Sequence, residues 1–434
     1  MAHFGVVTPA FLSHFNTMRA LAGALADRGH RVTFLHRPDA GAFVRDPRLA
    51  FRAVGAATHP PGSLAASLRL AARPGGPLGL RRVILDMART TTMLCKELPD
   101  AIDALGIDAV LADQMEPAGA LVAEALGLPF ISVACALPVN REPGIPLPVM
   151  PFGYGEDARS LKMVEGSTRV YDWMMGPHRR AVEAQARWLG VPVRGMLHEC
   201  LSPLAQISQT VAEFEFPRRE LPPHFHHVGP LRPLPGSGAG ASAAAPSCTP
   251  LPEIDPTRPF VFASLGTMQG GRFGLFKRMA RACRENGAQL LLAHCGGLEA
   301  QQEAALRRFG ADWVCAFAPQ QAALERADAV ISHAGWNTIM DAIASRTPML
   351  ALPIAFDHPG GAARVRRAGI GIQASARTAS AATLARHLRR LLDDPGFGQR
   401  LAPLGAAVAR AGGTARAADI IEAALCLRRS GTPA

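Results

Sequence analysis

The 434-residue sequence contains no uninterrupted apolar run long enough to cross a membrane. Its longest apolar stretch, residues 117–139, is broken by Glu124, Pro129 and Pro138, a pattern typical of a buried helix followed by a strand. The first residues also lack the basic stretch, apolar stretch and cleavage site of a secretory signal peptide. We therefore expect no transmembrane segment and a cytoplasmic location.

Metal and disulfide signatures are also scarce. The eight cysteines include no Cys-x-x-Cys pair and lie mostly within apolar patterns, as small core residues do. His224, His226 and His227 stand close together, yet neither a carboxylate nor a cysteine lies at ligand spacing around them. The sequence therefore predicts no metal site, no disulfide framework and no bound cofactor.

The net charge of +11 could mean attraction to nucleic acid, to an anionic membrane or to a nucleotide substrate, or it could reflect solvated helix faces. The basic residues are spread over helix-like segments and lack the interleaved aromatics of a single-strand binder. Such positions are Arg364, Arg366, Arg367, Arg386, Arg389 and Arg390. We favour solvated helix faces, keep a membrane surface as the alternative, and expect no nucleic-acid partner.

The first half of the chain alternates short apolar strands with amphipathic helices. Met18, Leu21 and Leu25 recur at helical spacing, and Pro117 and Gly127 mark the start and end of a further helix. Strands are expected at residues 4–8, 32–35, 107–112 and 130–133. This alternation predicts a doubly wound α/β domain with a parallel sheet.

A segment rich in Pro, Gly, Ser and Ala, residues 233–258, separates two such halves. Beyond it, strands are expected at residues 260–263, 289–293, 313–317, 329–332 and 349–352. We predict two Rossmann-like domains, residues 1–232 and 259–434, the second carrying the carboxyl-terminal helices. Two α/β domains that face each other bind ligands in the cleft at the carboxyl ends of their strands.

The segment that follows the strand at residues 329–332 carries the clearest ligand signal. His333 is followed by the small residues Ala334 and Gly335 and by a helix that begins with Asn337 and Thr338 in its first turn. A helix amino terminus offers unpaired N–H groups and a positive dipole end, which suit a diphosphate. An ordinary capped turn explains the same residues, so the neighbouring segments decide between the two.

Those neighbours fit a nucleotide. Phe317, Ala318 and Gln320 end an earlier strand, where an aromatic face and an amide suit a base and its ribose. Asp341 lies one helical turn beyond Asn337 and could accept from ribose hydroxyls. A second phosphate loop is expected at Ser264, Gly266 and Thr267, where glycine permits a close backbone approach.

In the first half, two titratable residues follow neighbouring strands. His14 lies just after the strand at residues 4–8, and Asp113 directly follows the strand at residues 107–112. Parallel strands bring both loops to one edge of the sheet, where a carboxylate can orient an imidazole. We predict that His14 is a general base and Asp113 its partner, against the alternative of a structural histidine.

Residues 317–358 resemble the nucleotide-sugar signature of the family 1 glycosyltransferases, which have the two-domain GT-B fold. The matched elements are F-A-P-Q, H-A-G-W-N-T, D and D-H, which begin at Phe317, His333, Asp341 and Asp357. The resemblance assigns the diphosphate to His333, Asn337 and Thr338 within a loop that includes Gly335 and Trp336. It also assigns the nucleobase to Phe317, ribose to Gln320 and Asp341, and sugar hydroxyls to Asp357 and His358, where many members have glutamine instead of histidine.

The resemblance covers nearly the whole chain outside the linker and is strongest to the bacterial zeaxanthin glucosyltransferases. It implies an inverting, metal-independent transfer of a hexose, with UDP-glucose as co-substrate, to a lipophilic hydroxylated acceptor such as a carotenoid. The proline-rich segment 137–152, which carries apolar Ile145, Leu147, Val149 and Met150, would shape the acceptor site. Peripheral attachment to the inner membrane face would supply such an acceptor.

Three alternatives stay open at this point. The acceptor could be another lipophilic small molecule, such as a macrolide, a polyketide or a sterol-like compound. The protein could instead be a nucleotide-sugar epimerase with a similar two-domain fold. It could also bind nucleotide sugars without turning them over, although the presence of both His14 and Asp113 argues against that.

Overall fold

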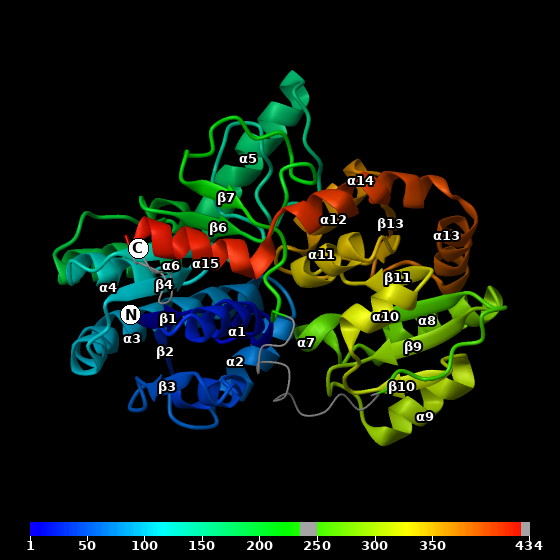
Figure 1. Cartoon of the computed structure of the whole chain (residues 1–434). Coiled ribbons are helices and arrows are strands. Elements are labelled where there is room, and N and C mark those ends of the chain that lie inside the picture. Colours follow the sequence, from blue (N-terminus) through cyan, green and yellow to red (C-terminus); the bar gives the residue numbers. More distant parts are fainter. Residues whose placement is uncertain (235–249, 427–434) are drawn as a thin grey trace, which may run out of the picture.

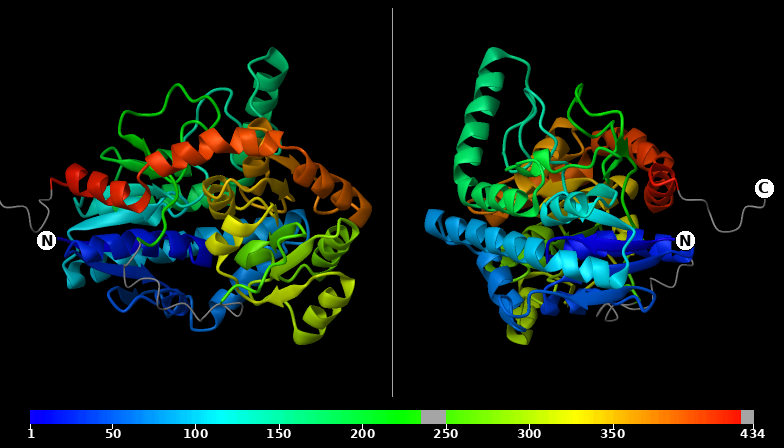
Figure 2. Two further views of the ribbon diagram at one scale, coloured as in Figure 1. Left: turned by 45° about the vertical axis from the view of Figure 1, so that its right-hand side comes forward. Right: turned by 90° about the vertical axis from the view of Figure 1, so that its left-hand side faces the viewer.

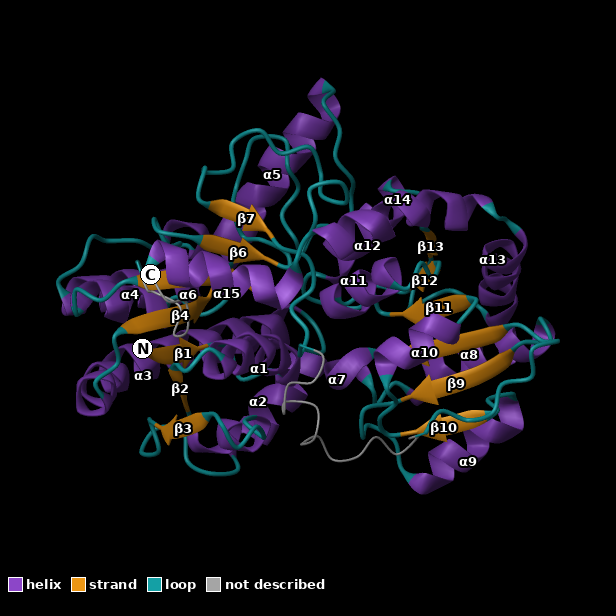
Figure 3. Ribbon diagram, in the orientation of Figure 1, coloured by secondary structure: helices purple, strands orange, loops and turns teal. Residues whose placement is uncertain are grey.

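The computed structural model describes residues 1–234 and 250–426, which form two parallel β-sheets with helices on both faces (Figure 1, Figure 3). The first sheet has the strand order β3-β2-β1-β4-β5-β6-β7, and the second has the order β10-β9-β8-β11-β12-β13. In each sheet the chain starts in the middle, runs to one edge and returns to build the other side. The predicted doubly wound fold is confirmed; residues 235–249 of the predicted linker lie outside the described residues.

Strands of the first sheet match the four predicted positions and add three short strands. Every neighbouring pair is parallel, with Phe4 opposite Val32 on one side and Ala109 on the other. The central strands are continuous apolar runs because helices cover both faces of a parallel sheet. The bounds are β1 His3–Val7, β2 Arg31–His36, β3 Ala50–Ala53, β4 Ala109–Asp113, β5 Phe130–Ala134, β6 Gln206–Ser208 and β7 Phe225–His227.

Helices of the first half cover both faces of this sheet. In α1 the residues Phe15, Met18, Leu21 and Leu25 are fully buried, and Gly29 turns the chain with a φ of 87° after the helix ends. The α-helices are α1 Leu12–Asp27, α2 Ser63–Ala72, α3 Pro77–Leu105, α4 Ala118–Ala125, α5 Ala158–Met174 and α6 Gly176–Leu189. Two 3₁₀ helices are η1 Pro38–Phe43 and η2 Leu197–Glu199.

The second sheet repeats this organisation after the linker. Its strands are β8 Phe260–Ser264, β9 Gln289–Ala293, β10 Trp313–Cys315, β11 Ala329–Ser332, β12 Met349–Ala351 and β13 Gly371–Gln373. Strand β10 is shorter than the predicted 313–317, because the backbone leaves the sheet there and Phe317 turns towards a cavity. The helices are α7 Gly266–Gln269, α8 Phe273–Glu285, α9 Ala300–Phe309, α10 Gln320–Arg326, α11 Trp336–Ala344, α12 His358–Arg367, α13 Ala381–Asp393, α14 Gly396–Arg410 and α15 Gly413–Ala424.

The last helix, α15, leaves the second sheet and packs beside α1 of the first (Figure 1, Figure 2). Ala417, Ala418 and Ile421 are fully buried in the same apolar cluster as the β1 and α1 side chains. The carboxylate of Glu422 accepts hydrogen bonds from Arg28 at 2.6 Å and pairs with His30 at 3.1 Å. The carboxyl-terminal helix is therefore part of the packing of the amino-terminal domain, and the assignment of all carboxyl-terminal helices to the second domain was wrong for α15.

A buried ion pair also joins the two halves. The guanidinium of Arg364 on α12 donates from Nε to the carboxylate of Glu215 at 2.7 Å, and both side chains are almost fully buried. Arg364 also lies over the ring of Phe216, 4.0 Å from its centroid. The expectation of a solvated helix face was therefore wrong for Arg364, because a carboxylate and an aromatic ring from the other half compensate the buried cation.

No helix in the described part of the chain is long and apolar enough to cross a membrane.

We expect Glu422→Ala to lower the free energy of unfolding by about 2 kcal/mol. The substitution leaves buried His30 without its carboxylate, whereas Arg28 keeps Asp419 as a partner. Urea unfolding followed by circular dichroism measures the change, with Glu220→Ala at an exposed position as the matched control. Equal effects of the two variants would contradict the docking role of α15.

Candidate functional site

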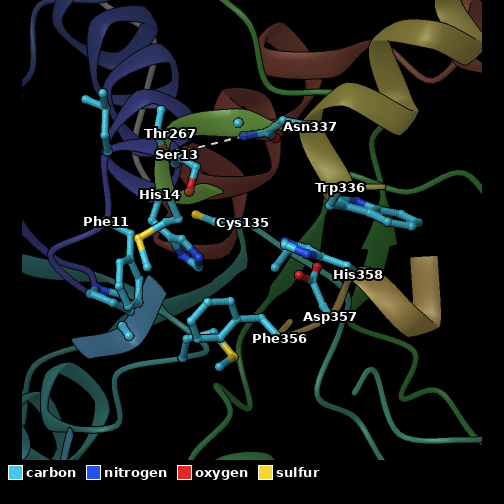
Figure 4. A pocket seen from close by; sticks show the side chains of 18 of the residues that line it. Phe11, Ser13, His14, Cys135, Thr267, Trp336, Asn337, Phe356, Asp357 and His358 are labelled. Carbon is cyan, nitrogen blue, oxygen red and sulfur yellow. Dashed lines mark hydrogen bonds between the residues drawn. The ribbon is translucent and has the colours of Figure 1, made fainter. Parts of the chain in front are cut away.

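A cavity of about 500 Å³ lies between the two halves of the chain. Its wall combines residues that follow β1, β2, β4 and β5 with residues that follow β8, β10, β11 and β12. Figure 4 shows His14 and Cys135 on one side of this cavity, facing Asp357 and His358 on the other. The carboxyl ends of both parallel sheets therefore meet at one site, as expected for facing α/β domains.

His14 and Asp113 form a hydrogen-bonded pair on the first wall. Strands β1 and β4 are adjacent, with Val7 opposite Ala112, so the residues that follow them meet at the sheet edge. The Nδ1 atom of His14 lies 2.7 Å from a carboxylate oxygen of Asp113, which also accepts from the Thr8 hydroxyl at 2.8 Å. The other oxygen accepts from the backbone N–H of Met115 at 2.9 Å. The proton on Nδ1 leaves Nε2 as the atom that can accept a proton.

This pairing changes the acidity of both groups. Burial lowers the pKa of His14, but the charge and hydrogen bond of Asp113, helped by the charge of Asp357, outweigh it and raise the pKa above its ordinary value of 6.5. Burial raises the pKa of Asp113, and the charge and hydrogen bond of His14 with the Met115 amide outweigh it and lower the pKa. His14 is thus a stronger base than a free imidazole, and Asp113 stays ionised.

Cys135 adds a third polar atom to this pair. His14, Asp113 and Cys135 place a ligand-type atom each within 4.8 Å of one another, in the only group of this kind within residues 1–234 and 250–426. However, the imidazole and the carboxylate already bind each other, and burial raises the pKa of the Cys135 thiol well above its ordinary value. A protonated thiol is a poor metal ligand, so the donor set suits a hydrogen-bonded dyad better than a cation.

On the second wall, the turn after β11 places His333 beside the amino terminus of α11. Ala334 has a φ of 63°, and Gly335 is the residue before the helix. A Cβ atom at Gly335 would lie 2.3 Å from the His333 ring, and one at Gly266 would lie 2.7 Å from it. Glycine at both positions therefore makes room for the imidazole. Burial lowers the pKa of His333 to about 4, so it presents a neutral ring near pH 7.

The loop after β8 lies next to this turn because β8 and β11 are paired, with Ser264 opposite Ser332. The Ser264 hydroxyl accepts from the backbone N–H of Gly266 at 3.2 Å, and Gly266 has a φ of 69°. Ser264, Gly266 and Thr267 all line the cavity. The two predicted phosphate loops are therefore brought together at one end of the cavity.

Phe317, Ala318 and Gln320 also line the cavity, but Asp341 does not. The side chain of Asp341 lies behind Gln320 and accepts from its amide at 2.7 Å and from Arg232 Nε at 2.8 Å. Gln320 is the residue that reaches the space where a ribose would lie. Asp341 is placed to position Gln320, and Arg232, which the sequence analysis missed, neutralises Asp341.

The first turn of α11 binds the opposite half of the chain. The side-chain amide of Asn337 donates to the carbonyl of Ser13 at 3.4 Å and accepts from Gln209 at 3.1 Å (Figure 4). Trp336 is 3% exposed and stacks on Phe214 with ring centroids 5.8 Å apart. Thr338 lies beside Gln320 and lines the cavity with Asn337. Asn337 therefore lies where a diphosphate is expected and also joins the two halves.

Asp357 and His358 lie at the start of α12 and face the His14 wall. The ring of His358 stands perpendicular to that of His333 with centroids 4.4 Å apart. Its Nδ1 accepts from the backbone N–H of Ala355 at 3.2 Å. Burial, with the nearby His333 and Arg272, lowers the pKa of His358 well below 6.5. His358 is therefore a neutral ring whose Nε2 carries the proton and can donate.

The remaining cavity wall is mostly apolar and belongs to the first half of the chain. From the proline-rich segment, Leu147, Pro148 and Val149 line the cavity. Ile145 instead packs against Phe216, and Met150 is outside the cavity wall. The segment is irregular as predicted, and the backbone N–H of Gly360 on α12 donates to the carbonyl of Pro148 at 3.0 Å. Other apolar wall residues are Leu64, Leu68, Val83, Met87 and Met196.

Comparisons with known proteins agree with this architecture. Residues 205–405 match the family model described as UDP-glucoronosyl and UDP-glucosyl transferase. The chain is 50% identical to the zeaxanthin glucosyltransferase of Pantoea ananas, with 98% of this chain and 96% of that one aligned. It is 46% identical to the zeaxanthin glucosyltransferase of Pseudescherichia vulneris, with 98% of each chain aligned.

Solved structures show the same fold at low sequence identity. The glycosyltransferase of kitacinnamycin superposes with a TM-score of 0.71 at 21% identity and covers 98% of this chain and 99% of its own. The calicheamicin glycosyltransferase gives a TM-score of 0.71 at 19% identity, with 98% of both chains covered. Both are GT-B enzymes in architecture: two Rossmann-like domains facing a cleft. The chain belongs to the family of UDP-sugar-dependent glycosyltransferases, and it is an enzyme of the GT-B fold.

We expect histidine NMR to find His14 titrating above pH 6.5, with His333 neutral down to about pH 4. Asp113→Asn removes the charge that raises the pKa of His14, so the His14 midpoint moves to lower pH in that variant. The exposed Asp103 provides the matched control as Asp103→Asn. A His14 midpoint that does not respond to Asp113→Asn would disprove the coupling.

Proposed function

We propose that the enzyme transfers glucose from UDP-glucose to a ring hydroxyl of a carotenoid such as zeaxanthin, with inversion at the anomeric carbon. The observation that carries this proposal is the His14–Asp113 dyad, which faces Asp357 and His358 across the cavity. An acceptor hydroxyl at His14 and a sugar at Asp357 would lie on opposite walls. The two zeaxanthin glucosyltransferases that align over nearly the full chain support the choice of acceptor.

In this mechanism His14 takes the proton of the acceptor hydroxyl through Nε2. Asp113 holds the ring in position and stabilises the imidazolium that forms, which is why it must remain ionised. The acceptor oxygen attacks the anomeric carbon from the face opposite the diphosphate. The configuration therefore inverts, and an α-linked donor gives a β-glucoside.

The departing UDP would be stabilised by protein groups at the end of the cavity that holds the phosphate loops. The amino terminus of α11 supplies N–H groups and a positive dipole end, and His333 supplies a ring N–H. Phe317 would stack on the base, and Gln320 would bind the ribose. In this proposal the reaction needs neither a metal nor another cofactor, since the phosphate end of the cavity has no carboxylate pair among its described residues.

His358 is the main departure from the family signature in the donor site. Its neutral Nε2–H can donate to a sugar hydroxyl, as a glutamine amide would, while Asp357 accepts. A histidine ring offers one donor, whereas glutamine offers both a donor and an acceptor. We therefore propose that Asp357 is the only one of these two residues that accepts hydrogen bonds from the sugar hydroxyls.

We expect His14→Ala to lower turnover by about two to four orders of magnitude, because it removes the general base. Binding of UDP, measured by calorimetry, should be nearly unchanged, since His14 lies on the wall opposite the phosphate loops. The assay incubates UDP-glucose with zeaxanthin and identifies the product and its anomeric configuration by mass spectrometry and NMR. EDTA is added in a parallel reaction to test for a metal requirement.

The same assay separates the alternatives. Release of an isomerised sugar nucleotide without acceptor would favour an epimerase, and binding without hydrolysis or transfer would favour a non-catalytic protein. Transfer to a macrolide or sterol-like alcohol but not to zeaxanthin would support the glycosyltransferase assignment and contradict the carotenoid as acceptor.

A lipophilic acceptor implies delivery from a membrane, and we assign this role to α5. The helix projects from the body of the molecule (Figure 1, Figure 2). Met163, Val170 and Trp173 on this helix are 42%, 57% and 80% exposed. On the inner side, Tyr171 lines the cavity. The helix also exposes basic side chains at Arg159, Lys162 and Arg169, of which Arg169 pairs with Glu165, and this surface suits an anionic bilayer at the cytoplasmic side.

We expect the protein to sediment with vesicles that contain phosphatidylglycerol at low salt and to be released at high salt. Trp173→Ala should weaken this binding, because interfacial tryptophan contributes apolar contact. Trp188→Ala, at a 58% exposed position on α6, is the matched control. Equal binding of both variants, or none by the unmodified protein, would reject α5 as the contact face and leave the transferase assignment intact.

A further inference from the structure

A buried arginine interrupts the apolar wall of the acceptor end. Arg37 directly follows β2, is 2% exposed, and lines the cavity. Its NH2 group donates to the hydroxyl of Thr90 on α3 at 2.7 Å, and its NH1 group donates to that of Ser67 on α2 at 3.3 Å. The buried Nε has no hydrogen-bond partner, and none of the ion pairs among the described residues includes Arg37.

Such an arrangement is costly for a purely structural residue. A guanidinium has five N–H donors, and this one donates to only two partners, the hydroxyls of Ser67 and Thr90. A buried cation usually requires a carboxylate in contact, because desolvation costs several kcal/mol. Here burial lowers the pKa of Arg37, and only the more distant charges of Asp86, Asp39 and Glu116 oppose that effect.

A carboxylate stands on the same part of the wall. Val83, Asp86, Met87 and Thr90 recur every three or four residues along α3, so one face of the helix meets the cavity. Asp86 is half-buried, and no hydrogen bond is recorded for its carboxylate. Arg37 and Asp86 thus present a donor and an acceptor on a wall that is mostly apolar, although other polar side chains such as Glu116 and His178 also line it.

Because β1 and β2 are adjacent parallel strands, Arg37 and His14 lie at the same sheet edge. A group bound at Arg37 therefore belongs to the acceptor molecule rather than to the nucleotide, whose loops follow the second sheet. An anionic group is disfavoured, since Asp86, Asp39 and Glu116 surround the arginine. A neutral hydroxyl satisfies both partners, because it accepts from the guanidinium and donates to the carboxylate.

We propose that Arg37 and Asp86 form a polar subsite that binds a second oxygen substituent, preferably a hydroxyl, on the end of the acceptor that enters the cavity. This inference rests on the proposed function and refines it. An apolar chamber holds a hydrocarbon acceptor in many orientations, and one directed hydrogen bond selects the orientation that presents the reactive hydroxyl to His14. Arg37 and Asp86 are positioning residues, and the reaction itself is unchanged.

The test compares three carotenoid acceptors that differ in the reacting ring. One ring carries a single hydroxyl, the second an additional hydroxyl, and the third an additional carbonyl. The unmodified enzyme should have a kcat/KM at least about tenfold higher for the second acceptor than for the first, as a hydrogen bond to a charged group predicts. Arg37→Met should abolish this preference, and Asp86→Ala should abolish only the preference for hydroxyl over carbonyl.

Further measurements separate binding from folding. Arg37→Met should leave hydrolysis of UDP-glucose without acceptor and the affinity for UDP unchanged. The control is Arg81→Met at an exposed position of α3. If Arg37→Met does not fold, Thr90→Val, which frees the guanidinium, should reduce the preference to a smaller extent.

Each outcome is decisive for a different claim. Equal losses for all three acceptors in Arg37→Met, or no preference in the unmodified enzyme, would overturn the subsite. Absence of transfer to every acceptor by the unmodified enzyme would overturn the proposed function itself.

Discussion

The pairing of β1 with β4 is the constraint on which the site depends. It places the residues after both strands at one sheet edge and thereby brings together His14 and Asp113, which are 99 positions apart. The short hydrogen bond between them leaves Nε2 of His14 facing the cavity. The charge of Asp113 also raises the pKa of His14, so His14 accepts a proton more readily than a free imidazole does. The other neighbour of β1 is β2, which is followed by Arg37 and not by a carboxylate, so the partner of His14 comes from β4.

In the second half of the chain, burial lowers the pKa of the cavity histidines, whereas the pKa of His14 in the first half is raised. His333 and His358 are both buried without a carboxylate partner, and both remain neutral rings near pH 7. At the start of α11, backbone N–H groups, which do not titrate, supply the positive end of the helix dipole. The cavity therefore has one wall with a basic, proton-accepting histidine and one wall with neutral donors, an asymmetry that fits proton removal on one side and charge stabilisation on the other.

Much of the fold could be predicted, because long buried strands have continuous apolar patterns. Residues 289–293 and 329–332 form strands with exactly the predicted bounds, whereas β3, β6, β7 and β13 were missed. Those four strands have only three or four residues each and lie at or near sheet edges, where the apolar pattern is weak. The sequence analysis assigned the carboxyl-terminal helices to the second domain, because the position of α15 on the first sheet depends on packing that spacing does not show.

In the site, too, the sequence indicated residues that directly follow predicted strands, but it did not show contacts that depend on how helices and distant segments pack. Loops after predicted strands led to His14, Asp113, Ser264 and His333, because the carboxyl ends of parallel strands share an edge. Sequence spacing could not show that Asp341 lies behind Gln320, since that depends on which side of α11 faces the cavity and on Arg232 from a distant segment. Nor could it single out Arg37, whose surroundings come from β2, α2 and α3 together.

Asn337 lines the cavity and also contacts the first half of the chain. Its side chain bonds to Ser13 and Gln209 of the first half and also lies on the wall where a diphosphate is expected. The amide nitrogen of Asn337 donates to the Ser13 carbonyl and to the Thr17 hydroxyl, each at 3.4 Å, so a phosphate oxygen that accepts from it would replace one of these two contacts. Ser13 precedes His14 directly, and a change at that carbonyl acts on the first turn of α1. One side chain on the wall of the expected diphosphate site therefore contacts α1, the helix that carries His14.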